Sequence, residues 1–370
     1  MRSILWVDDV LRDRMPPWQA VGASPTEVLE VCAALEISEL VHHRVTRGGT
    51  TSDWPTEVRR ELERRTRSSM ARELVRAREI AQVLEALAAR AVSPIILKGA
   101  ALAHTTYDSP AMRPHVDTDL LIARDHVAIV RDTLAHLGYT EPPMTDGELV
   151  FCQFQMTKVD AFGIHHVFDV HWKISTHTMF ADLLTYTEMQ ADAVAIPALG
   201  PQARTTSAAH ALLLACVHPV MHHGNTDRLI WLFDIDVLVR RLSAGGLDSF
   251  ARLALSKRVA GICARQLSLA GERFSTPIPS DVMQMLTSSL SEPAAVYLRP
   301  RRRWHHELFW NVRNLQAWDD RVRLLREVLF PSARYMLDTY RLGPRGVLLV
   351  PALYVHRCAR GAWKILVGRK

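Results

Sequence analysis

Three aspartates have the type and spacing to bind a divalent metal ion. Asp117 and Asp119 are separated by one residue at the head of an expected strand, so their side chains share one face and lie roughly 6–7 Å apart along it. Asp169 lies among apolar residues in another expected strand, where an uncompensated charge would be costly. An Asp-X-Asp alone more often forms a cap or a turn. Together, three carboxylates on neighbouring strands suit Mg²⁺, which binds a few carboxylates and phosphate oxygens.

A Lys-Gly turn upstream has the features of a phosphate-binding turn. Lys98 and Gly99 follow a short apolar run and precede an expected helix, so Gly99 would let the backbone approach a ligand and the helix amides would bind an anion. Lys98 would add a point charge for phosphate. In the alternative interpretation, which these residues support equally, Gly99 only permits a tight turn and Lys98 is solvated. Arg113, four residues before Asp117, would hold phosphate oxygens in a bidentate contact or pair with Asp117 or Asp119.

Histidines near these residues have less specific patterns. His171 lies two residues after Asp169 and shares its face of the strand, so it would orient the carboxylate, contact the nucleotide, or be a satisfied core histidine. His218 and His222 have the four-residue spacing of a helical zinc pair. Pro219 lies between them and the usual glutamate is missing, so a contact with the nucleotide or with the sheet is the preferred interpretation.

Two further features have structural explanations. Asp234 and Asp236 form another Asp-X-Asp in an expected helix, where they point in different directions, and Asp234 is interpreted as a buried pairing residue or a helix-packing contact. The run at 299–306 gathers four arginines with Trp304. Such a cluster could bind phosphate-rich ligands, but the solvated start of a helix is the preferred interpretation.

Apolar periodicity predicts an α+β protein in which a small mixed sheet is embedded between N-terminal and C-terminal helical regions. Strands are expected at 95–97, 118–123, 149–159 and 164–174, with a turn at 160–163. Helices are expected at 25–40, 71–90, 99–107, 126–137, 208–221, 228–242, 247–269 and 321–340, and a loop at 44–53. We therefore predict an N-terminal helical region over 1–90, a mixed-sheet core over 91–200 and a C-terminal helical domain over 201–370.

The composition is that of a folded globular protein. Of 370 residues, 48% are hydrophobic and 23% are charged, which excludes a mainly disordered or collagen-like chain. The net charge of +6 fits a polyanionic ligand such as a nucleotide, but alone it is too weak to argue for a nucleic-acid binder.

Cysteine usage and hydropathy predict a cytoplasmic location. The five cysteines are far apart and form no C-x-x-C pair, which indicates a reducing compartment. The first residues lack the apolar core of a signal peptide. The longest apolar run, at 346–355, is about half the length of a membrane span, so we expect no span.

Three segments together carry a specific pattern: ILKGAALAHTTYDSPAMRPHVDTDLLI at 96–122, LAHLGY at 134–139 and FDVHWKI at 168–174. They combine a Lys-Gly turn, Arg-Pro before Asp-X-Asp, Gly-Tyr after a helix and a later Asp-hydrophobe-His-Trp strand. This pattern resembles the uncharacterised nucleotidyltransferase family of bacteria, which belongs to the polymerase-beta-like nucleotidyltransferase superfamily. The stretches at 210–223 and 228–234 resemble the helical half of that family, so the resemblance spans roughly residues 70–245.

The resemblance implies that the region 91–200 is a nucleotidyltransferase core. Asp117 and Asp119 would match the two metal-binding carboxylates. Asp169 would match the third, which helps to bind the catalytic metal and activates the acceptor hydroxyl. The cofactor would be Mg²⁺, or Mn²⁺ in its place.

The resemblance also implies a nucleotide-binding set of Lys98, Gly99, Arg113 and His171. Gly99 would match the glycine of the phosphate-holding turn. It is followed by Ala100, where the superfamily often has serine or glycine, so a hydroxyl contact to the triphosphate is missing. Lys98 or Arg113 would replace that contact.

These observations predict a Mg²⁺-dependent nucleotidyltransferase that moves a nucleoside monophosphate from an NTP to an unidentified acceptor and releases pyrophosphate. Two metal ions can hold the attacking and leaving oxygens of such a transfer. The acceptor would be a small molecule or a protein, and nucleic acid is not expected. Two alternatives stay open. One is a metal-dependent glycosyltransferase that uses a nucleotide sugar and has a larger Rossmann-like sheet before Asp117; the other is a catalytically inactive nucleotide-binding scaffold.

Overall fold

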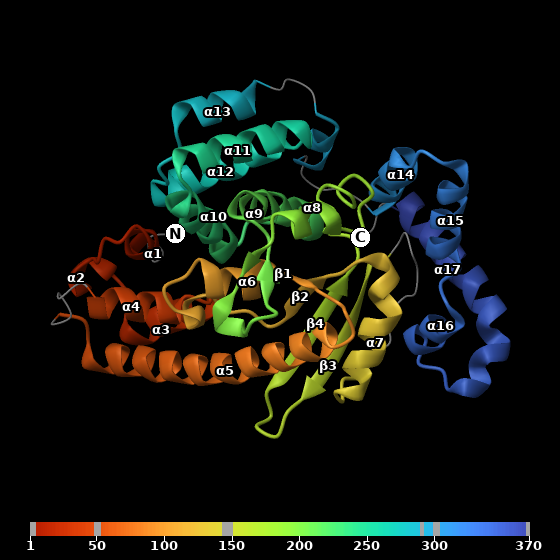
Figure 1. Cartoon of the computed structure of the whole chain (residues 1–370), viewed down its shortest axis with the longest axis horizontal. Coiled ribbons are helices and arrows are strands. Elements are labelled where there is room, and N and C mark those ends of the chain that lie inside the picture. The colour runs from red at the N-terminus through yellow and green to blue at the C-terminus, as the bar shows by residue number, and fades with distance from the viewer. Residues whose placement is uncertain (1–4, 48–52, 143–150, 289–291, 299–303, 368–370) are drawn as a thin grey trace.

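A six-stranded mixed sheet forms the centre of the fold, with helices before and after it in the chain (Figure 1). The computed structural model describes residues 5–47, 53–142, 151–288, 292–298 and 304–367. The strands follow the order β3-β4-β2-β1-β6-β5 across the sheet. They are β1 (Ile95–Leu97), β2 (Thr118–Leu121), β3 (Gln153–Val159), β4 (His165–His171), β5 (Val194–Ala195) and β6 (Arg204–Thr205). This mostly helical α+β architecture confirms the predicted fold class.

The helices that precede the sheet form one end of the molecule (Figure 1). They are α1 (Leu5–Leu11), α2 (Trp18–Val21), α3 (Pro25–Ala34), α4 (Ser38–Arg47) and α5 (Thr56–Ala88). A capping box around Ser24 fixes the start of α3, because it satisfies backbone N–H groups that the first helical turn leaves unpaired. The single helix predicted at 25–40 is wrong. The chain turns between α3 and α4, where Glu36 has a left-handed φ of 58°.

The connection from α4 to α5 is shorter than the loop predicted at 44–53. Helix α4 continues to Arg47, so the beginning of that loop is helical. Residues 48–52 lie outside the described part of the chain. Pro55 precedes α5 in an extended conformation, which agrees with the restriction that proline places on its own φ.

The long helix α5 runs along one face of the sheet (Figure 1) and contains the helix predicted at 71–90. The buried apolar side chains of its second half share a hydrophobic cluster with Leu120 and Phe168 of the sheet; they are Ile80, Val83, Leu84 and Leu87. Leu74, which the periodicity also assigned to this apolar stripe, is 73% exposed. The stripe therefore begins later in the helix than the sequence predicted.

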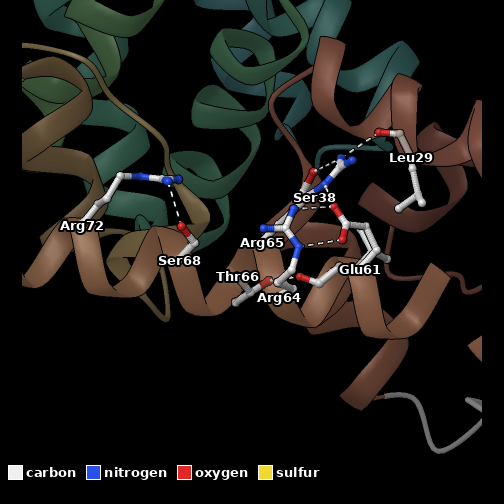
Figure 2. Close-up of polar contacts among 9 residues, drawn as sticks. Leu29, Ser38, Glu61, Arg64, Arg65, Thr66, Ser68 and Arg72 are labelled. Atoms are coloured by element: carbon white, nitrogen blue, oxygen red, sulfur yellow. Dashed lines mark hydrogen bonds and ion pairs between the residues drawn. The ribbon is translucent and has the colours of Figure 1, made fainter. Parts of the chain in front are cut away.

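Arg65 fixes the first half of α5 against the shorter helices (Figure 2). Its guanidinium donates hydrogen bonds to the carbonyl of Leu29 at 2.8 Å and to the Glu61 carboxylate at 2.8 Å, and it reaches Ser38 Oγ at 3.4 Å. Charge-assisted bonds to two neighbouring helices restrict how α5 can rotate. The second half of α5 is thereby held in place beside the sheet.

The central strands form where short apolar runs predicted them. Strand β1 has the predicted bounds, β2 ends two residues earlier than expected, and β3 and β4 form an antiparallel hairpin. The turn predicted at 160–163 closes this hairpin, because the Asp160 carboxylate accepts backbone hydrogen bonds from Phe162 and Ile164 at 2.8 and 2.9 Å. The predicted helices between the strands are α6 (Lys98–Thr105) and α7 (Val127–His136). The first residues of the strand predicted at 149–159 lie partly outside the described chain.

The other edge of the sheet was not predicted. Thr205 of β6 pairs in parallel with Ile96 of β1, and β5 pairs antiparallel with β6. Each of these strands is two residues long, which is too short for an alternating pattern to appear in the sequence.

The region after the sheet is helical, as predicted, but it is divided more finely. Helix α8 (Tyr186–Ala191) lies between β4 and β5, and the helices after β6 are α9 (Ala208–His222), α10 (Leu229–Arg241), α11 (Ala244–Ser256), α12 (Ala260–Phe274), α13 (Ser280–Thr287), α14 (Trp304–Asn314), α15 (Trp318–Leu329), α16 (Ala333–Thr339) and α17 (Val350–Val367). Short 3₁₀ helices are η2 (Pro110–Met112), η3 (Arg124–His126), η4 (Pro197–Leu199), η5 (Pro293–Leu298) and η6 (Pro344–Leu349).

Two of the predicted C-terminal helices are wrong. The helix expected at 247–269 is broken between α11 and α12, where Arg258 has a φ of 59°. The helix expected at 321–340 is broken between α15 and α16, since Pro331 cannot donate a helical hydrogen bond. Among the described residues, none of the helices combines the length and the apolar character needed to cross a membrane.

The sheet packs on both faces, and this decides where polar side chains of β2 point. Leu120 belongs to the cluster shared with α5 and α7, whereas Leu97 and Leu121 belong to a larger cluster with α9 and α10. Side chains alternate between faces along a strand, so Asp119 shares the face of Leu121.

The predicted division of the chain into regions at 1–90, 91–200 and 201–370 stays a prediction.

Candidate active site

Two of the predicted carboxylates face each other across neighbouring strands. Asp119 of β2 is directly opposite Asp169 of β4 in the parallel register of these strands. Asp169 in turn is opposite Gln155 of β3, whose amide donates a hydrogen bond to Asp169 Oδ1 at 2.9 Å. Potential ligand atoms of Asp119, Asp169 and His171 all lie within 4.8 Å of one another. The structure therefore brings together residues that are 50 positions apart in the chain.

Asp119 is the most deeply embedded carboxylate of this group. Its Oδ1 accepts a hydrogen bond from Lys98 Nζ at 2.6 Å and lies 2.9 Å from His171 Nε2. Burial alone would raise the pKa of this carboxyl, but the Lys98 ammonium and His171 hold its pKa well below the ordinary range. Among the described residues, Oδ2 has no hydrogen-bond partner, so an ionised oxygen stays available to a cation.

Asp117 lies one residue before β2 and lines the same cleft as Asp119 and Asp169. Burial, and then the negative charges of Asp119 and Asp169, raise its pKa. A cation bound between these carboxylates would offset their mutual repulsion. The structure thus groups Asp119 and Asp169 with His171 and leaves Asp117 at the rim of that group, whereas the sequence had grouped the three aspartates.

The Lys-Gly turn lies beside the carboxylates. Lys98 begins α6 with a left-handed φ of 53°, a conformation that is uncommon for non-glycine residues. A Cβ on Gly99 would lie 3.1 Å from His115 Cβ and 3.4 Å from Arg113 Nη1, so a side chain there would press on the neighbouring loop. Lys98 is half-buried, and its ammonium pairs with Asp119; this pairing raises its pKa although burial alone would lower it.

Arg113 connects the loop before Asp117 to the helical region. Its Nε and Nη2 donate to Asp234 of α10 at 2.7 and 2.8 Å, and its Nη1 donates to the carbonyl of Pro114 at 2.6 Å. Tyr107 donates a further hydrogen bond to Asp234 at 2.7 Å. The interpretation of Asp234 as a buried pairing residue is confirmed. The predicted alternative, in which Arg113 pairs with Asp117 or Asp119, is wrong, because the guanidinium is engaged by Asp234. Phosphate binding by Arg113 stays a prediction, and the contacts present are those of a positioning residue.

A second hydrogen-bond network, which the sequence did not reveal, connects α5 to the loop before β2. Buried Glu73 contacts His104 Nε2 at 2.9 Å and His115 Nε2 at 3.2 Å, and His115 Nδ1 lies 2.9 Å from the carbonyl oxygen of Asp117. Burial would raise the pKa of Glu73, but its hydrogen bonds with the two histidines lower it to about 2. Arg76 donates to the carbonyl of His115 at 2.5 Å. In the sequence, Glu73 looks like any solvated charge of an amphipathic helix.

The carboxylates line a cleft of about 1120 Å³ that is open to solvent. Its opposite wall comes from α9 and α10, where the rings of His223 and Trp231 have centroids 4.3 Å apart and Arg228 lies 5.1 Å above Trp231. His222 Nε2 contacts the carbonyl of Ile174 at 3.1 Å. Such a cleft, with aromatic rings on one wall and carboxylates on the other, can hold a ligand that has both a flat ring and anionic groups.

The zinc alternative for His218 and His222 gains no support from the geometry. Within the described ranges, these histidines belong to no group of three possible ligands. Burial, and then the charge of Lys98, lower the pKa of His222 to about 3. His222 contacts the end of the sheet region at Ile174, as one of the sequence interpretations expected. The basic run at 299–306 lies largely outside the described residues.

One family model matches the chain. The family is described as uncharacterised nucleotidyltransferase, and the match extends over residues 22–290, which is more than half of the chain. The matched part contains the sheet, the carboxylates and helices α9 and α10, and it includes the segments that carry the resemblance found in the sequence. No curated protein matches the chain significantly.

Proposed function

Because the chain belongs to the uncharacterised nucleotidyltransferase family, we propose that it transfers a nucleoside monophosphate from an NTP to an acceptor hydroxyl and releases pyrophosphate. Family membership implies the NTP substrate. The observation that carries the proposal is the placement of Asp119 opposite Asp169, next to the Lys98-Gly99 turn. A nucleotidyl transfer needs charge stabilisation and a phosphate-binding turn at one place, and these residues supply both.

The donor set fits an oxygen-preferring divalent cation. Asp119 Oδ2, the Asp169 carboxylate and Asp117 at the rim would hold it, with His171 orienting Asp119 through the contact at 2.9 Å. Carboxylate oxygens with room for phosphate oxygens suit Mg²⁺, and Mn²⁺ also accepts a nitrogen ligand such as His171. When bound, such a cation would stabilise negative charge on the transferring phosphoryl group.

The residues of the chain can perform the remaining tasks of the transfer. The acceptor oxygen forms a bond to the α-phosphorus, the bond from that phosphorus to the bridging oxygen breaks, and pyrophosphate leaves with the electron pair. The acceptor proton passes to Asp169, whose Oδ1 is already oriented by Gln155 at 2.9 Å. Lys98 and the backbone around Gly99 hold the triphosphate. The exposed ring of His223, which packs on Trp231, offers a face on which the base can stack.

The two alternatives receive less support. The glycosyltransferase alternative expected a larger Rossmann-like sheet before Asp117, but in the described chain only β1, three residues long, precedes that residue. The scaffold alternative expects a degraded site, whereas both facing carboxylates and Lys98 are in contact with partners.

All five cysteines are free, which supports a reducing compartment, and we place the protein in the cytoplasm.

We expect pyrophosphate release that depends on both an NTP and a divalent cation. Each of the four NTPs is incubated with the protein and Mg²⁺, Mn²⁺ or EDTA, with hydroxyl-containing small molecules or a protein extract as acceptors. Calorimetric titration of each NTP measures binding separately from turnover. NTP binding without pyrophosphate in any mixture would favour the scaffold, and turnover of a nucleotide sugar in place of an NTP would favour the glycosyltransferase.

A further inference from the structure

A second cavity adjoins the Lys-Gly turn and is lined by Lys98 and Gly99. It has a volume of about 920 Å³ and runs between α6, α9 and α10. Most of its wall is apolar, with Leu102, Leu214 and Leu238 at the sides and the small side chains of Ala211 and Ala215 along α9. Cavities that are lined mainly by apolar groups and have a few polar groups in the wall are typical of small-molecule sites. We refer to it as the apolar cavity.

The apolar cavity shares a wall with the carboxylate cleft. Lys98, Gly99, Arg113, His218 and Trp231 line both. A molecule in the apolar cavity can therefore reach the same Lys-Gly turn that would hold an NTP in the cleft. Adjoining cavities would bring an acceptor hydroxyl close to the α-phosphorus, and proximity of the reacting groups is what a transfer requires.

Charged side chains in the wall of the apolar cavity are already paired with one another or with neighbours. Lys98 pairs with Asp119, Arg113 pairs with Asp234, and Arg241 pairs with Asp108 at 2.9 Å. Hydroxyls in the wall are also engaged, since Thr105 and Thr205 each donate to a backbone carbonyl at 2.8 Å. A charged ligand would be desolvated there without a free counter-charge, which is costly.

His218 is the exception in this wall. Its Nδ1 is buried and has no hydrogen-bond partner among the described residues. Burial, and then the nearby charge of Lys98, lower its pKa well below the ordinary value, so the ring is neutral. A neutral imidazole can accept a hydrogen bond from a hydroxyl group. His218 therefore places a neutral ring, with one unpartnered buried nitrogen, in the wall that the two cavities share.

We propose that the apolar cavity holds the acceptor and that the acceptor is an uncharged alcohol with a largely apolar body, whose hydroxyl passes His218 to reach the carboxylate cleft. This inference rests on the proposed function. The atoms balance as in that transfer: the alcohol oxygen bonds to the α-phosphorus, pyrophosphate leaves, and the hydroxyl proton goes to Asp169.

The test fills the cavity and measures binding of a defined probe. 1-Octanol is titrated into the NTP-bound protein, with glycerol as the polar comparison, and the increase in Tm and the pyrophosphate release are recorded. We expect saturable stabilisation by 1-octanol and affinity that rises roughly fourfold per methylene from 1-butanol to 1-octanol. Ala211→Phe and Ala215→Phe should each weaken 1-octanol binding at least tenfold and leave NTP affinity unchanged, whereas the volume-matched Ala211→Ser and Ala215→Ser should bind it normally.

Three outcomes are distinct. Unchanged NTP affinity with lost 1-octanol binding in both phenylalanine variants supports the inference. Normal NTP binding with no saturable 1-octanol binding, or with binding that the phenylalanine variants do not weaken, overturns it and leaves the proposed function standing. A native protein that binds no NTP overturns the proposed function and this inference with it.

Discussion

Asp119→Asn is expected to lower nucleotidyl transfer by roughly 10³-fold or more, which corresponds to about 4 kcal/mol of transition-state stabilisation. Asparagine keeps the volume of the side chain but removes the charge that faces Asp169 and pairs with Lys98 at 2.6 Å. The cation would lose its most deeply placed anionic ligand, and Lys98 would lose its partner. Pyrophosphate release under saturating NTP and Mg²⁺ measures the effect.

A matched control separates this effect from damage to the fold. Asp125 is an exposed aspartate in η3, just past the end of the same strand, and Asp125→Asn should keep full activity. A thermal unfolding curve for each variant shows whether the fold is retained. If Asp119→Asn transferred nucleotides at a rate close to that of the native protein, Asp119 would not be part of the reacting site.

Arg113→Ala is expected to destabilise the protein by about 3–5 kcal/mol, the usual cost of breaking a buried ion pair by removing one partner. Among the side chains that the structure describes, the substitution leaves the buried Asp234 carboxylate with the Tyr107 hydrogen bond at 2.7 Å as its one remaining contact. Denaturant unfolding measures the loss, and Asp234→Asn should show a loss of the same kind. The double variant Arg113→Met with Asp234→Leu should recover much of the stability, because no unpaired charge stays buried.

The same variants decide between two roles for Arg113. If its main partner is Asp234, as the bidentate contacts indicate, the double variant should still bind NTP once it is folded. Wild-type stability of Arg113→Ala together with weak NTP binding would instead show that the guanidinium serves phosphate, as the sequence suggested. A measurement of NTP affinity beside each unfolding curve separates these results.

Local sequence patterns were sufficient to predict the central strands and part of the candidate site. The run at 95–97 is apolar and bounded by Pro94 and by the Lys-Gly turn, so it predicted β1 without error. Asp119 and Asp169 each lie in a strand that could be recognised from its apolar neighbours. Once those two strands pair in register, the carboxylates face each other. Here local and long-range preferences agree, which is why the prediction succeeded.

Other features depend on contacts that no local pattern encodes. The breaks at Glu36 and Arg258 use non-glycine residues with positive φ, so the usual glycine signal of a turn is missing. Pro331 indicates the end of a helix, but the apolar periodicity on both sides of it led to the prediction of one continuous helix. The pairing of Glu73 with His115 joins residues that are 42 positions apart, and the same holds for Arg113 and Asp234 at 121 positions. Such pairs are set by the packing of α5 and α10 against the loop before β2.

The measurement that tests nucleotidyl transfer most directly follows two labels of one NTP. The protein is incubated with Mg²⁺, an acceptor mixture and an NTP that carries radioactive phosphorus at either the α or the γ position. We predict that the α label enters the acceptor product, that the γ label appears only in pyrophosphate, and that Asp119→Asn abolishes both signals. Transfer of the γ label to the acceptor, or release of inorganic phosphate without pyrophosphate, would contradict the assignment.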